Sequence, residues 1–355
     1  MTRPTFAHID TAALRHNLAV ARSHAGNSRI MAVVKANGYG HGLACVAQAL
    51  ADADGFAVAT LDEAIFLRNS GWRKPILLLE GIFATDEIAA CVAYRLSLVV
   101  HQREQIRMLN ATRLTQPLAI FLKLNSGMNR LGFNAHEYAQ ALADVQSNPM
   151  LSNITQMSHF ATADDAIGIA DQLQVIQTCF ATSSYPTSLA NSAALFRYPA
   201  SLGDWVRPGI ALYGASPFAE RSATSLQLQA VMTLHSRIIA VQTLHSGAAL
   251  GYGQAWVADK TSRIGIVACG YADGYPRHAP TGTPVLVNGQ RTRTLGRVSM
   301  DMLFVDLTEL GEAGVGSQVI LWGQDLPVET VALAAGTISY ELLCARAQRV
   351  SERDL

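Results

Sequence analysis

Short apolar runs alternate with helical patterns along the first two-thirds of the chain. Between the first two runs, Leu43, Val46, Ala47 and Leu50 recur at the spacing of one helix face. Apolar runs typical of buried strands lie at residues 30–34, 55–59, 76–79, 97–100, 118–124, 153–158, 187–190 and 204–207. Eight strand-then-helix units over roughly 220 residues predict a (β/α)8 TIM barrel, with an open doubly wound sheet as the alternative.

The pattern changes after about residue 225, where β-rich runs are separated by Gly and Pro. Asn288-Gly289 joins two of these runs, and this dipeptide is typical of a tight hairpin because both turn positions need a positive φ. A helical stretch near 328–346 follows. We therefore predict two domains: a barrel over 1–225 and a mainly β domain over 226–355.

Composition and charge exclude several classes of partner. The chain has 355 residues, with 27 Lys+Arg against 27 Asp+Glu, so no basic excess attracts nucleic acid or an anionic membrane. No stretch reaches the ~18 apolar residues of a membrane span, and the N-terminus lacks the apolar run of a signal peptide. Five scattered cysteines indicate buried thiols of a reduced, cytoplasmic protein. Only 15% of residues are charged, which indicates surface buried between subunits.

Lys35 is the first candidate for chemistry. It follows the first predicted barrel strand, so it is aimed into the mouth where barrel active sites lie, and three glycines follow within seven residues. An amine desolvated there becomes a nucleophile for an aldehyde. Taken alone, a lysine at the end of a strand is about as often an ordinary surface residue as a catalytic one. The complete segment 33–42, VVKANGYGHG, resembles the cofactor-lysine motif of alanine racemases, which occurs in looser form in other barrel proteins that bind pyridoxal phosphate.

The resemblance extends over nearly the whole chain. Further segments similar to motifs of the alanine racemase family lie at 123–132 (KLNSGMNRLG), 158–164 (SHFATAD), 191–193 (NSA), 206–214 (VRPGIALYG), 250–253 (LGYG), 270–277 (GYADGYPR), 296–301 (GRVSMD) and 337–341 (TISYE). Their number and order across both domains make chance agreement negligible.

The resemblance implies a two-base mechanism. Lys35 holds pyridoxal phosphate as a Schiff base and then acts as one base, and Tyr252 of the partner subunit acts as the other. A phenol with a reference pKa of about 10 needs cationic neighbours to act as a base, and the implied network is His159 and Arg207. Without the other motifs, Tyr252 would be an aromatic residue beside a glycine turn and His159 a hydrogen-bonded core histidine.

The resemblance also places Arg207 against the pyridine nitrogen of the cofactor. An arginine stays charged and only donates, so the ring remains unprotonated and is a weaker electron sink, which favours racemisation over transamination. The alternative is an arginine that pairs with a surface acid.

The remaining implied contacts surround the cofactor and substrate. The phosphate is expected among Tyr39, Ser192, Gly209, Ile210 and Tyr340, with the Gly209-Ile210 backbone at the start of a helix. Ser192 could also, or instead, be a helix cap. Arg130 is implied to approach the cofactor's phenolic oxygen and the substrate carboxylate, and the backbone N–H of Met300 to bind that carboxylate. No metal is expected.

Lys123 aligns with a lysine that many family members carry as a carbamate. Here Asn125 stands where aspartate is usual, which removes a negative charge and leaves a carbamate, a solvated lysine and a bound anion all open. Positions implied to line the approach to the site, or to support its contact residues, are Asp164, Tyr271, Arg297 and Asp301. A narrow gate made by Tyr271 and Tyr340 would favour a methyl side chain.

These implications predict a homodimeric enzyme that interconverts L-alanine and D-alanine, either supplying D-alanine for peptidoglycan or degrading alanine. A non-catalytic pyridoxal-phosphate carrier is an alternative, although such proteins lack the β domain. A broad-specificity periplasmic racemase and an amino-acid decarboxylase with a similar barrel and β domain are further alternatives.

Overall fold

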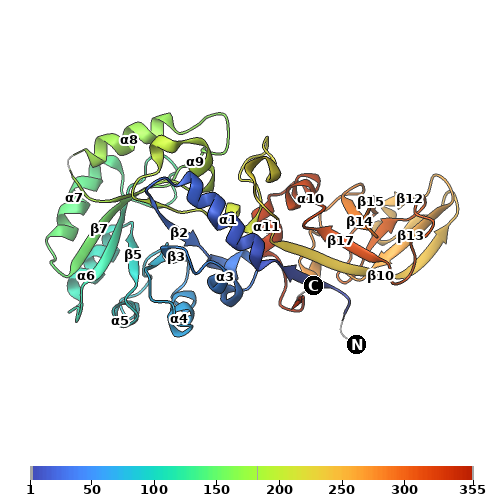
Figure 1. Cartoon of the computed structure of the whole chain (residues 1–355), viewed down its shortest axis with the longest axis horizontal. Helices are drawn as coiled ribbons and strands as arrows, with labels where there is room; N and C mark the ends of the chain where they lie inside the picture. The colour runs from blue at the N-terminus through green and yellow to red at the C-terminus, as the bar shows by residue number, and fades with distance from the viewer. Residues whose placement is uncertain (1–2, 182, 354–355) are drawn as a thin grey trace.

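The computed structural model describes residues 3–181 and 183–353. The molecule is elongated and has two lobes, an α/β lobe and a mainly β lobe (Figure 1). Helix α1 (Thr11–His24) lies between them, and the side chain of its N-cap, Asp10, accepts hydrogen bonds from the backbone of Ala12 and Ala13.

The α/β lobe is a closed barrel of eight parallel strands, so the predicted TIM barrel is confirmed. Each predicted apolar run overlaps one strand: β2 (Arg29–Val33), β3 (Gly55–Val58), β4 (Ile76–Leu78), β5 (Ser97–Val100), β6 (Leu118–Lys123), β7 (Leu151–Met157), β8 (Thr187–Ser188) and β9 (Trp205–Val206). The intervening helices are α2 (Lys35–Tyr39), α3 (Leu43–Ala49), α4 (Leu61–Asn69), α5 (Glu87–Ala93), α6 (Arg103–Ala111), α7 (Ala135–Gln146), α8 (Ala170–Phe180) and α9 (Ser192–Arg197).

The strands form where apolar side chains can be buried on both faces. All four residues of β3 and of β5 are buried, as expected for a parallel sheet enclosed by helices. Local signals then determine where helices begin. At the start of α4 the Thr60 hydroxyl accepts from the backbone N–H of Glu63, and the Glu63 carboxylate accepts from the backbone N–H of Thr60. The carboxyl ends of all eight strands meet at one rim, which is where Lys35 was predicted to lie.

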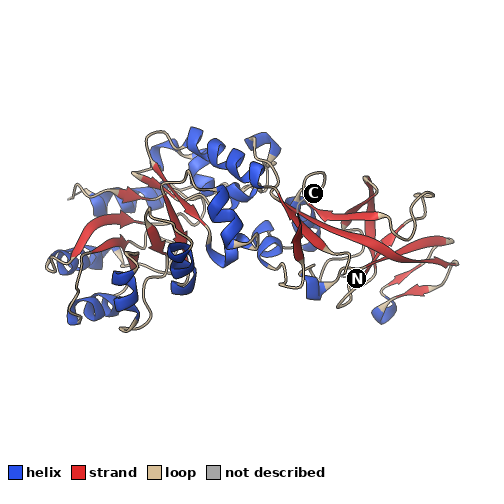
Figure 2. Ribbon diagram, turned by 60° about the horizontal axis from the view of Figure 1, so that its bottom comes forward, coloured by secondary structure: helices blue, strands red, loops and turns tan. Residues whose placement is uncertain are grey.

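The β lobe is built on one sheet with the strand order β13-β16-β15-β14-β17-β10-β1-β18, and β10 also pairs with β13. Figure 2 shows the strands of this lobe in red. Its strands are β1 (Phe6–Ile9), β10 (Met232–Leu244), β13 (Ser262–Val267), β14 (Pro284–Val287), β15 (Gln290–Leu295), β16 (Leu303–Asp306), β17 (Gln318–Trp322) and β18 (Ser351–Arg353). A separate ribbon pairs β11 (Ala249–Leu250) with β12 (Trp256–Val257). The Asn288-Gly289 hairpin is confirmed, with φ of 47° and 77° at its two positions.

The N-terminal strand belongs to the β lobe. β1 pairs antiparallel with β10 and parallel with β18, so Phe6–Ile9 join the sheet of the C-terminal region. The domain division between residues 225 and 226 stays a prediction.

Three expectations need correction. The helical stretch near 328–346 is two helices, α10 (Val328–Ala335) and α11 (Ser339–Cys344), because Gly336 ends the first in a left-handed conformation. The helix expected after Gly209 is a single 3-10 turn, η2 (Ile210–Tyr213). Cys344 is exposed, so the five cysteines are not all buried. Within residues 3–181 and 183–353, no helix is long and apolar enough to cross a membrane.

Candidate active site

Lys35 begins α2 directly after the first barrel strand and is half-buried. The backbone that follows it makes a left-handed turn, with positive φ at Ala36 (54°), Asn37 (53°), Gly38 (62°), Tyr39 (50°) and Gly40 (77°). A left-handed conformation costs about 1–2 kcal/mol for each residue that is not glycine. The turn must therefore be stabilised by contacts with the rest of the protein.

Those contacts come from distant parts of the chain. The Asn37 backbone N–H donates to the Glu63 carboxylate at 3.0 Å, and the Asn37 side-chain oxygen accepts from the backbone of Leu43 at 2.8 Å. The Arg346 guanidinium donates to the Gly40 carbonyl at 2.5 Å. The lysine is thus held on a backbone that is fixed on both sides.

Tyr39, at the end of this turn, lies against the segment that follows the last barrel strand, β9. Its ring stacks on Tyr213 with centroids 4.5 Å apart, and the Tyr213 hydroxyl donates to the Val33 carbonyl at 3.0 Å. The Tyr39 hydroxyl contacts the backbone of Gly209, where an added Cβ would stand 2.6 Å from that oxygen. Burial raises the pKa of Tyr39, so its hydroxyl remains a neutral donor.

Ser192 is buried beside Gly209. Its hydroxyl oxygen accepts from the backbone N–H of Gly209 at 2.9 Å and of Ala211 at 3.4 Å. The cap of α9 is Asn191, whose side chain accepts from the Ala194 N–H, so a capping role for Ser192 is wrong. Ser192, Gly209 and Tyr39 therefore form a small polar cradle next to Lys35's turn.

Arg207 is buried below this cradle, with only 3% of its surface exposed. It donates to the Ser188 hydroxyl and the Ser158 carbonyl, both at 2.7 Å, and to the Leu189 carbonyl and His159 Nδ1, both at 3.3 Å. No carboxylate of the described residues pairs with it, so the alternative of a surface ion pair is wrong. Burial lowers the pKa of Arg207 to about 10, which leaves the guanidinium charged at neutral pH.

His159 is held neutral by its surroundings. Burial lowers its pKa well below the usual range, and the nearby cations Arg207 and Lys123 lower it further. Because Nδ1 accepts from Arg207, the ring hydrogen is assigned to Nε2. The histidine therefore holds one terminal nitrogen of Arg207 in place without adding charge to the site.

Lys123 ends β6 and is buried, and its amine forms no hydrogen bond with the part of the chain that the structure describes. Burial lowers its pKa to about 8, and Arg207, Arg130 and Lys35 lower it further, opposed by Glu80. Four cations thus converge on one rim with a single weakly opposing carboxylate. Such a site attracts anions.

Asn125 uses its side chain locally. Its side-chain oxygen accepts from the backbone of Gly127 and Asn129, and its amide donates to the Asn129 side chain at 3.0 Å. These bonds fold the loop that carries Arg130, which is exposed. Asn125 therefore shapes the loop and supplies no charge to Lys123.

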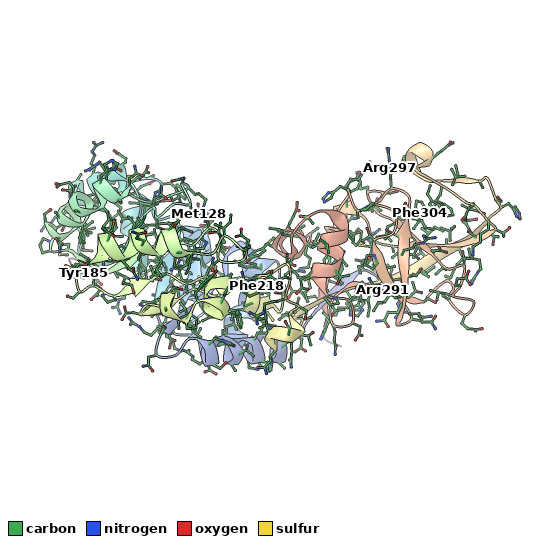
Figure 3. All side chains as sticks on the ribbon, turned by 90° about the horizontal axis from the view of Figure 1, so that it is seen from above. Met128, Tyr185, Phe218, Arg291, Arg297 and Phe304 are labelled. Carbon is green, nitrogen blue, oxygen red and sulfur yellow. The ribbon has the colours of Figure 1, made fainter. Side chains whose placement is uncertain are left out.

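Tyr252 lies far from Lys35 within one chain. It begins the short turn η4 (Tyr252–Gln254) and is 71% exposed, and β12 just after it lies at the outer end of the β lobe (Figure 1). Arg297 lies at the same end, where a Cβ on Gly253 would stand 3.0 Å from its guanidinium (Figure 3). Met128 of the barrel and Arg297 lie on the same side of the molecule (Figure 3).

Met300 and Tyr271 are also exposed on the β lobe, at 53% and 40%. The Tyr271 backbone donates to the Ser299 carbonyl at 3.0 Å, and the Asp301 carboxylate accepts from Arg349 at 2.7 Å. These bonds fix the loop over 296–301 against the neighbouring turn.

Asp273 supports the same loop, and sequence reasoning assigned it no role. It is buried and accepts from Arg3 at 3.0 Å, from Arg349 at 2.7 Å and from the Gly270 backbone at 3.0 Å. Arg3 also donates to the Asp301 carbonyl. The segment 270–277 carried a signal in its resemblance to the family, but Arg3 at the far N-terminus carried none.

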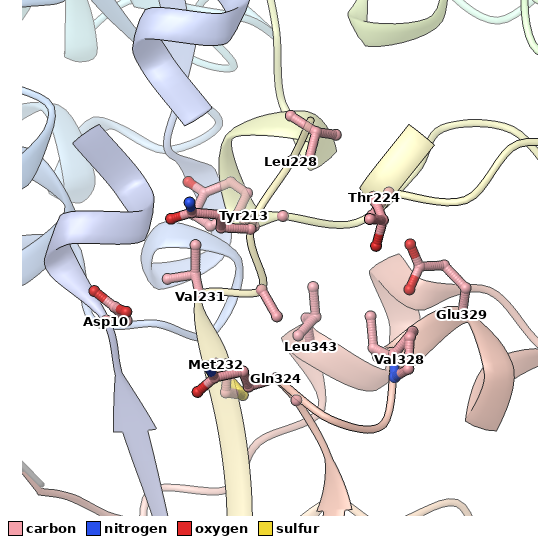
Figure 4. Close-up of a pocket in the computed structure, with 16 residues that line it drawn as sticks. Asp10, Tyr213, Thr224, Leu228, Val231, Met232, Gln324, Val328, Glu329 and Leu343 are labelled. Atoms are coloured by element: carbon pink, nitrogen blue, oxygen red, sulfur yellow. The ribbon is translucent and has the colours of Figure 1, made fainter. Parts of the chain in front are cut away.

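Tyr340 and Asp164 approach the site from different lobes. The Tyr340 ring centroid lies 6.1 Å from that of Tyr39. Burial raises the pKa of Tyr340, and Asp164 raises it further. Behind Tyr213 a cavity of about 400 Å³ separates the lobes, with Asp10 and Glu329 at opposite sides (Figure 4).

The structure therefore brings together, at the carboxyl ends of the barrel strands, most of the predicted cofactor residues and the supporting Lys123: Lys35, Tyr39, His159, Ser192, Arg207, Gly209 and Lys123. It leaves Tyr252, Tyr271, Arg297, Met300 and Asp301 on the β lobe. In the part of the chain that is described, no three His, Cys, Asp or Glu side chains group as metal ligands do.

Comparison with known proteins accounts for both lobes. A model described as "Alanine racemase, N-terminal domain" matches residues 9–217, and one described as "Alanine racemase, C-terminal domain" matches residues 231–353. The chain belongs to the alanine racemase family. This confirms the family predicted from the motifs, and with it an amino-acid isomerase.

Individual relatives agree over their full lengths. The alanine racemase of Nitrosospira multiformis is 57% identical over 353 residues, which cover 99% of each chain. The structure of biosynthetic alanine racemase from Pseudomonas aeruginosa matches with a TM-score of 0.97 at 46% identity, covering 100% of both chains. The alanine racemase structure from E. faecalis matches with a TM-score of 0.90 at 35% identity, also over both complete chains.

Proposed function

We propose that this protein interconverts L-alanine and D-alanine using pyridoxal phosphate and two bases. The observation that carries the proposal is the rim of the barrel, where Lys35 stands on a fixed turn beside a polar cradle and buried Arg207. The family's match across the β lobe argues against a non-catalytic carrier, because the expected carriers lack that lobe.

The residues at the rim fit pyridoxal phosphate. Four cations, Lys35, Lys123, Arg130 and Arg207, face a site with little opposing charge, which suits a phosphate dianion. Because Gly209 has no side chain, the hydroxyls of Tyr39 and Ser192 both approach its backbone closely. Phosphate oxygens would accept from these hydroxyls, from the Gly209 N–H in place of Ser192, and from the Ile210 N–H.

Arg207 would set the electronic character of the cofactor. Its Nη2 donates to Ser158, Leu189 and His159, and its Nη1 donates to Ser188 alone. Its Nε–H and the second N–H of Nη1 donate to no acceptor among the described residues, and a remaining N–H donor suits a ring nitrogen that lacks a proton. Pyridoxal phosphate, when bound, supplies an electron sink that acidifies the Cα–H of an attached amino acid.

The chain's own residues move the proton. The Lys35 amine takes or returns the Cα proton on one face, and the Tyr252 hydroxyl does so on the opposite face. Arg130 and the backbone N–H of Met300 hold the substrate carboxylate, so that the Cα–H points at a base whichever enantiomer is bound. Tyr271 and Tyr340 narrow the approach and favour a methyl side chain.

The second base comes from a partner subunit in this proposal. Within one chain Tyr252 is 71% exposed at the outer end of the β lobe, and Met300 and Arg297 are also exposed on that lobe. These residues are therefore available to a second copy of the chain. A homodimer that exchanges β lobes would complete two equal sites.

The test uses complementary variants. Lys35→Ala should abolish racemisation and cofactor attachment, while Tyr252→Phe should slow Cα deuterium exchange of one enantiomer more than that of the other. Mixed Lys35→Ala and Tyr252→Phe subunits should regain one complete site in each heterodimer. Full activity of Lys35→Ala would disprove the proposal, and a mixture without any recovery would disprove the shared site.

The physiological direction follows from supply and demand, because the same residues serve D-alanine synthesis for peptidoglycan and alanine breakdown. The cytoplasmic location expected from the sequence stays a prediction, which cell fractionation would test.

A further inference from the structure

A second cavity lies at the opposite end of the barrel from Lys35. It has a volume of about 840 Å³ and is lined by the first residues of β2, β5 and β9, which are Arg29, Ser97 and Trp205, and by Phe121 and Thr155 further along β6 and β7. In a TIM barrel this end usually serves stability, and the interior is packed with bulky apolar side chains. A cavity here with polar walls therefore needs a separate explanation.

Strand register shows that the lining residues face the barrel interior. Ala119 and Phe121 lie four and two residues before Lys123 on β6, so all three side chains point to the same side. Ser97 pairs with Ala119, and Thr155 pairs with Phe121. Of these four interior positions, Ser97, Ala119, Phe121 and Thr155, the first two thus carry small side chains where large ones would fill the space.

A bulge in β7 widens the same end. The register between β6 and β7 shifts between Ala119 and Phe121, and Asn153 on β7 has a positive φ of 47°. Bulges and left-handed residues other than glycine are costly and recur at functional sites. Asn153 also lines the cavity.

The cavity carries one uncompensated positive charge. The Arg29 guanidinium lies over the Trp205 ring, 4.1 Å from its centroid, and it forms no hydrogen bond or ion pair with the described residues. No Asp or Glu is among the lining residues. Stacking leaves the edge of the guanidinium free, and that edge binds carboxylates with two parallel bonds.

Two hydroxyls also open on the cavity. Ser97 is 7% exposed and Thr155 is 5% exposed, and neither hydroxyl forms a hydrogen bond with the residues in the described ranges. Neither oxygen is among the fully buried polar atoms that lack a partner, so both are accessible from the cavity and can bind a ligand or water. Beside them, Gln146 donates to the Tyr185 hydroxyl at 3.0 Å and so orients a third aromatic ring at the cavity.

We propose that this floor of the barrel is a binding site for a small aromatic carboxylate. The Arg29 guanidinium binds the carboxylate, the rings of Phe121, Tyr185 and Trp205 contact the flat apolar part, and Ser97 and Thr155 bind a polar substituent. The site is separate from the racemisation site and does not depend on it.

The test follows binding of 4-fluorobenzoate to the holoenzyme by fluorine NMR, with saturating alanine present to occupy the racemisation site. The neutral isostere 4-fluorobenzamide is the ligand control. Arg29→Gln should weaken benzoate binding at least tenfold, and Ala119→Met should block it by filling the cavity. Arg291→Gln, an exposed arginine on β15, is the matched protein control and should bind like the unaltered enzyme.

Racemisation rates of Arg29→Gln and Arg291→Gln should equal that of the unaltered enzyme, which shows that both variants are folded. No saturable benzoate binding, equal binding by Arg29→Gln, or complete displacement by alanine would each overturn the proposal. If Arg29→Gln does not fold, the two ligands decide between the outcomes. Equal affinity of the unaltered enzyme for the benzoate and the benzamide would overturn the proposal of a carboxylate site. A preference for the benzoate that is lost in Ala119→Met would support the proposal.

Discussion

Replacing Gly209 with alanine tests the polar cradle most directly. The added Cβ would stand 2.6 Å from the Tyr39 hydroxyl oxygen and 3.3 Å from the adjacent ring carbon, against 3.4 Å or more for an ordinary contact. Gly209 has a φ of −120° and a ψ of −92°, and the close contact of the new Cβ with Tyr39 is the effect that this substitution tests. The ring cannot retreat freely, because it is stacked on Tyr213 at 4.5 Å.

The expected cost is that of overpacking a buried site, about 1–3 kcal/mol. Tyr39 and the Gly209 N–H both belong to the proposed phosphate cradle, so most of that cost should appear as weaker cofactor binding. We expect the dissociation constant of pyridoxal phosphate to rise by roughly 10- to 100-fold, since about 1.4 kcal/mol corresponds to tenfold. Titration of the apoenzyme, followed by cofactor absorbance, measures it.

Two further variants make the test specific. Gly311→Ala is the matched control, because an added Cβ there meets nothing within 4 Å. Gly209→Ala combined with Tyr39→Phe removes the closest atom and should recover part of the lost affinity relative to Tyr39→Phe alone. Unchanged cofactor affinity in Gly209→Ala, or no recovery in the double variant, would refute the steric reasoning.

Three more predictions follow from buried groups. Lys123 has a folded pKa of about 8, below its usual 10.5, so the unfolded chain keeps the proton at pH values where the folded chain has lost it. The apoenzyme should therefore gain about 1.6 kcal/mol of unfolding free energy between pH 8 and 9.5 relative to Lys123→Met, as urea denaturation would measure. Parallel pH profiles of the two proteins would contradict this. Asp273→Asn should cost about 2 kcal/mol, less than for a fully buried pair because Arg3 and Arg349 are each 37% exposed, with Asp259→Asn as the exposed control. Tyr213→Phe should lose about 1 kcal/mol of stability with its hydrogen bond to Val33, but its cofactor affinity should stay within about threefold. Tyr213→Leu also removes the stacked ring and should bind the cofactor more weakly than Tyr213→Phe. Equal cofactor affinities of the two variants would show that the stacked ring does not position Tyr39.

The barrel strands were predictable because burial on both faces forces continuous apolar runs such as 76–79. The Asn288-Gly289 hairpin was predictable for an equally local reason, since two positive φ values need those residues. By contrast, the partners of β1 are more than 200 residues away, and a four-residue strand holds no information on what it pairs with.

The same distinction applies to the site. The motif around Lys35 indicated its chemistry, but Ala36 and Tyr39 are residues that rarely take a positive φ, so the left-handed turn was not predictable. Ser192 follows Asn191, and either could cap a helix by type; only the fold places the Ser192 hydroxyl against Gly209. Asn125 was expected to matter through a missing charge, and its side chain instead folds a loop.

The left-handed turn has a consequence for protein synthesis. Its Gly40 carbonyl accepts from Arg346, and a Cβ on Gly40 would stand 2.1 Å from the Leu343 carbonyl, so the turn is packed against a segment 306 residues further along the chain. Residues 343–346 must therefore leave the ribosome before the lysine turn can reach its final form. The cofactor site of the barrel is completed only when α11 packs against this turn.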